Sequence, residues 1–327
     1  MMEEEKTSYK AIAKLVDEWV PLHVGQTFDI DMICRDLQAV SRSARHAVTT
    51  KLFNDCKTGK CEKANRLYKY ISFNKEYIPW YDFTEDDVIP FNWPKGRDGS
   101  KFPFDGHLKF RPTDLFVMAG VSNKGKSTIA KNILWENMDE WNGRITLFVN
   151  EYQPARFARN ADMMCWNTPF NLDGKPKFEL LRLEGDWQYA IEPDHLNIID
   201  WIELADDFFR IGEILKAIQQ KLRKGMAVVI IQKGEGRELG TGGQFGEHRA
   251  SYYWAVDEGR FLFKKAKEYN DYNPNGKTYG FTTAEGCFMN NLRELKKCCQ
   301  CAGTGERYSR EAGGKISCLG CEGKGWL

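Results

Sequence analysis

The residues whose spacing has the clearest chemical meaning are Gly120 and, after four intervening positions in GVSNKGKST, Gly125, Lys126 and Ser127. Glycines let a backbone wrap closely around phosphates, and the loop N–H groups together with the start of a following helix supply positive potential. A lysine at this spacing can reach the β- and γ-phosphates, and the serine hydroxyl can ligate Mg²⁺. The spacing therefore predicts a site for a nucleoside triphosphate with magnesium.

The elements that must position this loop are visible on both sides of it. The apolar run 115–119 predicts a strand, and 128–138 predicts a helix, which is the context that a Walker A motif requires. The alternative is a chance glycine turn that enters a helix, and the flanking elements disfavour it. The residues expected to contact phosphate are Gly120, Val121, Ser122, Asn123, Lys124, Gly125, Lys126, Ser127 and Thr128.

Three later strands end in polar residues that belong to the same chemistry. RITLFVN is followed by Glu151, HLNIID ends in Asp200, and MAVVIIQ ends in Gln232. A carboxylate at a strand end can act as a general base or hold Mg²⁺. In a rival alignment MAVVIIQ would be the acidic, magnesium-binding strand, but its tip has neither Asp nor Glu, so Asp200 is preferred.

A phosphate loop, a strand that ends in glutamate and then a helix at PARFARNADMMCW together resemble the DnaB, RadA and KaiC branch of the RecA-like ATPases. The resemblance implies that Glu151 activates the attacking water, that Asp200 and Ser127 hold magnesium, and that Gln232 senses the γ-phosphate. It also implies ATP sites at subunit interfaces, and therefore a hexamer or filament. The alternatives are a solvated strand-end carboxylate for Glu151 and a helix cap for Asp200.

Two later segments supply further candidates. The glycine-rich segment 234–249 lies where RecA-like proteins carry mobile DNA-binding loops, so Arg237 and Arg249 are DNA-binding candidates there; a disordered surface loop is the alternative. Lys265 and Lys267 lie one residue apart on one strand face and resemble the Lys-x-Arg pair that related subunits insert into a neighbour's ATP site. Ordinary exposed strand lysines are the alternative.

Four cysteines near the end of the sequence have the spacing of a metal site. Cys298 and Cys301, then Cys318 and Cys321, form two Cys-x-x-Cys pairs, each followed by Gly-x-Gly at the same offset. Four thiolates in this arrangement suit tetrahedral, structural Zn²⁺. The repeated CxxCxGxG resembles the DnaJ cysteine-rich finger, with two of its four repeats.

The first part of the chain resembles a winged helix-turn-helix. FDIDMICRDL and RSARHAVTTKLFNDC predict two helices around a turn, and GKCEKANRLYKYI predicts a β-wing. Residues 41–71 contain eight Lys or Arg against two acids. A protein-docking winged helix with a solvated basic face is the alternative to DNA binding. The DNA-binding candidates are Arg42, Arg45, His46 and Lys51.

Composition and element order define the expected architecture. With 47 Lys and Arg against 46 Asp and Glu, the net charge of +1 gives no global attraction to DNA or membranes. No apolar run is long enough to span a bilayer, so a cytoplasmic or nucleoid-associated protein is expected. Alternating strands and helices predict an α/β fold with a mainly parallel sheet. The predicted parts are a winged-helix module at 1–82, a linker or collar at 83–112, a RecA-like core at 113–293 and a zinc finger at 294–327.

These expectations lead to an oligomeric, ATP-dependent motor or remodeller that acts on single- or double-stranded DNA and works with a replication or recombination partner. The sequence does not distinguish between a helicase, a recombination or annealing factor, and a loader. The runner-up is a nucleotide-switched DNA-binding or adaptor protein with little turnover. A small-molecule kinase is third, because the sequence lacks an evident lid and acceptor pocket.

Overall fold

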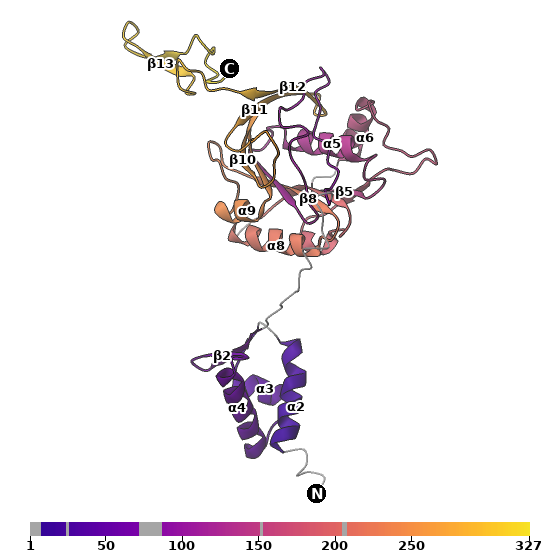
Figure 1. Ribbon diagram of the computed structural model, residues 1–327, viewed down its shortest axis with the longest axis vertical. Coiled ribbons are helices and arrows are strands. Elements are labelled where there is room, and N and C mark those ends of the chain that lie inside the picture. Colours follow the sequence, from indigo (N-terminus) through magenta and orange to yellow (C-terminus); the bar gives the residue numbers. More distant parts are fainter. Residues whose placement is uncertain (1–7, 24–25, 72–86, 151–152, 205–207) are drawn as a thin grey trace. The chain divides into compact units, whose positions relative to one another are not determined.

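The computed structural model describes residues 8–23, 26–71, 87–150, 153–204 and 208–327 (Figure 1). Their contacts divide the chain into two compact units, Met1–Asp82 and Phe83–Leu327. No helix among the described residues is long and apolar enough to cross a bilayer.

In its described residues, the first unit packs three α-helices against a small antiparallel sheet. Its core includes Val16, Phe28, Val48 and Leu52, and the strand order is β1-β3-β2. Side chains define two of the helix starts, because Asp29 accepts a hydrogen bond from the Met32 N–H and Ser41 accepts one from the Ala44 N–H. The elements are α2 (Tyr9–Trp19), η1 (Val20–Leu22), β1 (Thr27–Phe28), α3 (Ile30–Asp36), α4 (Arg42–Lys57), β2 (Cys61–Ala64) and β3 (Leu67–Tyr70).

The second unit is built on a nine-stranded sheet with the order β12-β11-β10-β9-β4-β8-β7-β5-β6. The six strands from β9 to β6 in this order are parallel to one another, and β9 to β12 form an antiparallel meander. The strands are β4 (Leu115–Gly120), β5 (Ile145–Val149), β6 (Glu179–Arg182), β7 (Leu196–Ile202), β8 (Met226–Gln232), β9 (Tyr252–Asp257), β10 (Arg260–Ala266), β11 (Thr278–Ala284) and β12 (Phe288–Leu295).

Helices cover both faces of the parallel part of this sheet (Figure 1). Along β4, Phe116 and Met118 pack into the same core as α5, whereas Val117 and Ala119 pack into the core of α8. This alternation follows from the period of two in a strand, and it confirms the predicted α/β class with a mainly parallel sheet. The helices are α5 (Lys126–Asn137), α6 (Pro154–Met163), α7 (Trp187–Ala190), η3 (Phe208–Arg210), α8 (Ile211–Lys221) and α9 (Gln244–Arg249).

The segment 87–112, expected to be a linker or collar, packs on the antiparallel side of the sheet through aromatic side chains. Trp93, Phe102 and Phe104 are fully buried, and the Trp93 ring stacks on Trp254 of β9 with 5.2 Å between centroids. Burial of this much aromatic surface contributes strongly to stability. The described part of this segment therefore belongs to the core of the second unit.

The chain ends in a two-stranded hairpin, β13 (Glu306–Ser309) and β14 (Gly314–Ser317), beside the four predicted metal ligands. Trp326 connects this small module to the sheet, because it pairs with Lys297 in an isolated bridge and lies 5.5 Å from the guanidinium of Arg260 in β10.

Candidate nucleotide and metal sites

The loop between β4 and α5 has the conformation that its glycines require. Gly125, the N-cap residue of α5, has a φ of +93°, and a Cβ there would lie 3.3 Å from Phe281. A Cβ on Gly120 would lie 2.6 Å from Cδ of Lys126. A larger residue at either position would therefore disturb the loop or the lysine.

Lys126 lies in the floor of this loop with only 6% of its surface exposed. Its Nζ donates to the Val121 carbonyl at 2.6 Å. Burial lowers the pKa of Lys126 to about 8; the nearby Asp200 carboxylate opposes this shift, and the Lys233 ammonium adds to it. The site thus holds a poorly solvated cation whose charge an incoming anion would stabilise.

The tertiary structure brings Asp200 to the loop. The Ser127 hydroxyl donates to the Asp200 carboxylate at 3.1 Å, although 73 positions separate the two residues in sequence. Strand β8 lies between β4 and β7, and in the register Gly120 is beside Gln232 while Val149 is beside Asp200. A hydroxyl and a carboxylate at this separation provide the oxygen ligands that Mg²⁺ prefers.

These groups share one cleft of about 620 Å³ at the carboxyl edge of the parallel strands. The predicted loop residues that line it are Ser122, Asn123, Gly125, Lys126, Ser127 and Thr128, together with Asp200 and Gln232. Lys124 instead forms an ion pair with Glu258, which follows β9. Ligands of open α/β sheets commonly bind at this edge.

Two elements that sequence reasoning did not place at the site complete the cleft. One is α6, which contributes Arg156 and Asn160, and the other is the tip of the β11–β12 hairpin around Gly286. The Gly286 carbonyl accepts hydrogen bonds from Thr128 Oγ1 at 3.2 Å and from Lys131 Nζ at 2.5 Å. The polar residues at 153, 156 and 160 have helical spacing, so the sequence pattern could have predicted which face of α6 lies toward the cleft. No local sequence pattern predicts the contact of the hairpin.

Glu151, the predicted general base, lies outside the described residues. The preceding strand β5 ends at the same sheet edge as Asp200, and Asn150 lines the cleft. The role of Glu151 itself stays a prediction.

The two predicted trans-acting lysines differ in their surroundings. Lys265 Nζ donates to the carbonyls of Glu247 at 2.9 Å and His248 at 3.2 Å. It therefore interacts with the last turn of α9, where a cation also complements the helix dipole. Lys267 is exposed.

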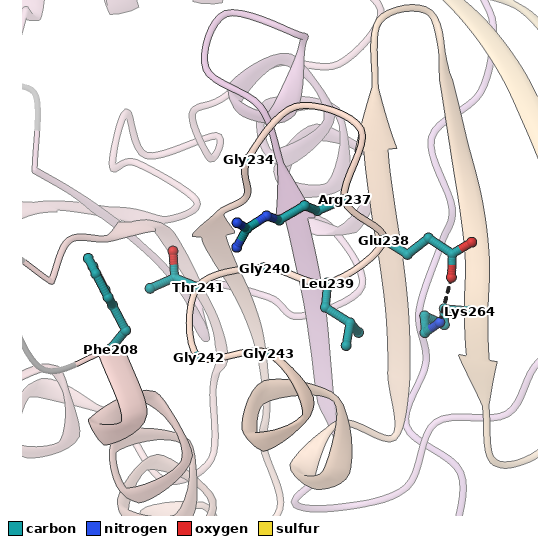
Figure 2. A pocket seen from close by; sticks show the side chains of 10 residues that line it. All are labelled: Phe208, Gly234, Arg237, Glu238, Leu239, Gly240, Thr241, Gly242, Gly243 and Lys264. Atoms are coloured by element: carbon teal, nitrogen blue, oxygen red, sulfur yellow. Dashed lines mark hydrogen bonds and ion pairs between the residues drawn. The ribbon is translucent and has the colours of Figure 1, made fainter.

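The glycine-rich segment forms an anchored loop beside a second cavity, also of about 620 Å³. The buried Lys233 donates to the Arg237 carbonyl at 2.7 Å, and the Thr241 N–H donates to the Gln232 carbonyl at 2.7 Å. Figure 2 shows the Arg237 guanidinium directed into the space between this loop and Phe208, with the Glu238–Lys264 ion pair at the far side. Arg237 and Arg249 are both exposed.

The four DNA-binding candidates of the first unit fall into two groups. Arg42 and His46 are exposed on the first turns of α4, and Arg45 is exposed but forms an ion pair with Asp31. Lys51 is 8% exposed, and its Nζ lies 2.8 Å from both the Asp17 and Asp55 carboxylates. We therefore omit Lys51 from the proposed DNA surface, because its ammonium is already neutralised in the interior.

The four predicted cysteine ligands form a buried cluster. All four Sγ atoms lie within 4.8 Å of one another, with 3.9 Å between Cys298 and Cys318 and 3.7 Å between Cys301 and Cys321. A tetrahedral Zn²⁺ with Zn–S bonds of ~2.3 Å places its sulfurs about 3.8 Å apart. The donor set and its spacing therefore fit zinc.

Each knuckle directs one backbone N–H at a cysteine sulfur. The Gly305 N–H donates to Cys301 Sγ at 3.3 Å, and the Gly325 N–H donates to Cys321 Sγ at 3.1 Å. Burial raises the pKa of Cys301, but N–H donation from Gly305 and Gly303 and the neighbouring thiols outweigh it and lower that pKa to about 6. Burial and the neighbouring thiols raise the pKa of Cys321 to about 11, so one thiol of this coupled pair ionises before the other.

Comparison with known proteins adds no family to this description. No protein-family model matches the chain, and no curated protein sequence matches it.

Proposed function

We propose that this protein is a RecA-like P-loop ATPase that binds DNA as an oligomer and acts as a motor or remodeller. The observation that carries the proposal is the 3.1 Å contact between Ser127 and Asp200, beside the buried Lys126. A P-loop ATPase needs a lysine at the phosphates and a hydroxyl–carboxylate pair for Mg²⁺ in one cleft. The contact supports Asp200 as the magnesium-binding carboxylate, and it disfavours the alignment that gives this role to the strand MAVVIIQ.

The order of the strands supports the same assignment. Strand β8 lies between the loop strand and the Asp200 strand, so Gln232 faces the cleft between the phosphate loop and the magnesium ligands. In the proposed reaction Lys126 binds the β- and γ-phosphates, Mg²⁺ is held by Ser127 and Asp200, and Glu151 takes the proton of the attacking water.

The proposed DNA contacts come from exposed basic residues. In the first unit, α3, α4 and the β2–β3 hairpin have the element order of a winged helix, and Arg42 and His46 lie at the amino end of α4, where recognition helices meet the major groove. In the second unit, Arg237 and Arg249 belong to the anchored glycine-rich segment. Phosphate contacts of this kind are weakened by salt, which provides a direct check.

The cysteine cluster is proposed to hold one structural Zn²⁺. Four protein ligands leave no open coordination position, so its contribution is to the folding of the terminal module and to partner contacts. A nucleotide-switched adaptor is the second candidate function, favoured by Lys265, a proposed trans-acting residue whose ammonium is bonded to α9. Such a protein would bind ATP but hydrolyse it slowly.

The test is ATP turnover with and without single- and double-stranded DNA. We expect DNA to stimulate wild-type turnover, Lys126→Ala to abolish it, and Glu151→Gln to bind ATP without hydrolysing it. Full DNA-stimulated turnover by Glu151→Gln would refute the catalytic assignment. Tight ATP binding with slow turnover that neither DNA changes would support the adaptor instead.

A further inference from the structure

We propose that Arg156 is a catalytic residue that acts in cis, with its guanidinium stabilising the charge that develops on the γ-phosphate of ATP bound to the same chain. This inference rests on the proposed ATPase function. In this proposal Arg156 takes the role that we expected Lys265 and Lys267 of a neighbouring subunit to have.

The first support is the face that α6 presents to the cleft. Gln153, Arg156, Phe157 and Asn160 all line it, and their spacing of i, i+3, i+4 and i+7 corresponds to one side of a helix. The helix begins just after β5, whose end lies beside Asp200 in the sheet register. Arg156 is therefore in the first turn of α6, at the edge of the sheet that also carries the magnesium-ligand candidates.

The second support is the balance of charge in the cleft. Its described cationic side chains are Lys126, Lys131, Arg156 and Arg159, against the acids Asp200 and Glu285. Burial lowers the pKa of Lys131, and the positive charge of Arg156 contributes to that shift. Like charges that approach each other in a cleft are stabilised by an anion placed between them.

The third support is what the other cations of the cleft already contact. Lys126 and Lys131 donate to the Val121 and Gly286 carbonyls, and Arg159 lies 3.3 Å from Glu285. Within the described ranges, Arg156 has no hydrogen bond or ion pair. Its guanidinium is therefore the cation that can turn toward the phosphates without losing an existing partner.

The fourth support comes from the alternative, in which a neighbouring subunit supplies the cation in trans. Lys265 donates to two carbonyls of α9, so moving its ammonium to a neighbour's nucleotide would break both of these hydrogen bonds. Arg156 needs no such exchange, and an arginine provides the planar fork of donors that suits a phosphoryl group.

The chemistry defines what Arg156 would do. Water forms a bond to the γ-phosphorus, the bond from that phosphorus to the bridging oxygen breaks, and ADP leaves with the electron pair. The products are ADP, inorganic phosphate and one proton. Negative charge grows on the bridging and γ-oxygens. A guanidinium at the γ-oxygens lowers the barrier without tightening the binding of ADP, because these oxygens leave with the phosphate.

The experiment compares Arg156→Ala and Arg156→Lys with wild type in the full-length protein. We expect Arg156→Ala to lower kcat on the order of a thousandfold, while the Kd for ADP stays within about threefold, and Arg156→Lys to recover part of the loss. Arg182→Ala, which removes an exposed arginine of β6 paired with Glu184 outside the cleft, is the matched control. Equal weakening of ADP and ATP binding with kcat preserved would overturn the proposal, because Arg156 would then be a base or ribose contact.

A mixing experiment separates cis from trans. Subunits with Lys126→Ala are mixed with subunits carrying Arg156→Ala; a cis residue leaves every site incomplete, so turnover should stay at the mutant level. Recovery of turnover in the mixture would overturn the cis assignment. If wild type itself shows no turnover, the proposed ATPase function fails, whereas wild-type turnover with an unaffected Arg156→Ala variant refutes the arginine alone.

Discussion

At the scale of single residues, Lys126 should make ATP affinity depend on pH. Burial lowers the pKa of Lys126 to about 8, so its ammonium is charged below this pH and loses its proton as the pH rises through it. Phosphate binding requires the charged form of Lys126. Above pH 8, ATP binding is therefore accompanied by the uptake of a proton by this side chain. We expect ATP affinity to fall by up to about tenfold per pH unit there, measured by calorimetry between pH 7.5 and 9.5.

Lys126→Arg is the control for this pH dependence. Arginine keeps its charge throughout the range, so the variant should bind ATP with an affinity that does not change above pH 8. Wild-type affinity that is constant up to pH 9.5 would contradict the role of the lysine charge.

At the scale of elements, the turn between β4 and α5 combines a backbone requirement with a binding function. Gly125→Ala should cost about 1–2 kcal/mol in the free energy of unfolding, because φ is +93°. It should also weaken ATP binding, because the added methyl group would meet Phe281 at 3.3 Å and shift the loop. Chemical denaturation and nucleotide titration measure the two effects.

Gly174→Ala is the matched control for Gly125→Ala. Gly174 has a φ of +78° in a turn of the second unit, and a Cβ added there would meet nothing within 4 Å, so the backbone cost should be similar without an effect on ATP. If both variants lost ATP affinity equally, the loop would have no special role.

At the scale of the whole molecule, the terminal module should depend on its metal while the large sheet does not. The four cysteines are the buried core of this module, and it is connected to the sheet through Trp326. Cys298→Ser should release zinc and unfold residues 296–327, because metal binding and folding are coupled in small modules. Metal analysis and hydrogen exchange would follow the two events.

Cys299→Ser is the control for the zinc experiment, because Cys299 is exposed and its thiol is outside the cluster. It should keep one zinc per chain and the same exchange pattern as wild type. Stoichiometric zinc in Cys298→Ser would show that this cysteine is dispensable for metal binding.

The sequence by itself determined the features that depend on residues close together in the chain. The phosphate-loop spacing, the paired cysteines and the capped helices α3 and α4 are of this kind, because glycine geometry, thiolate ligation and N-caps act within a few residues. Alternating strands and helices were also sufficient to predict the α/β class.

Only the tertiary structure decided which distant residues meet. It brought Asp200 to Ser127, inserted β8 between β4 and β7, and added α6 and the β11–β12 hairpin to the cleft. It also buried Lys51 between two carboxylates, and it placed Lys265 where its ammonium donates hydrogen bonds to α9. Strand order and side-chain pairing depend on the packing of the whole core, and a local pattern contains no information about which partner a lysine will find.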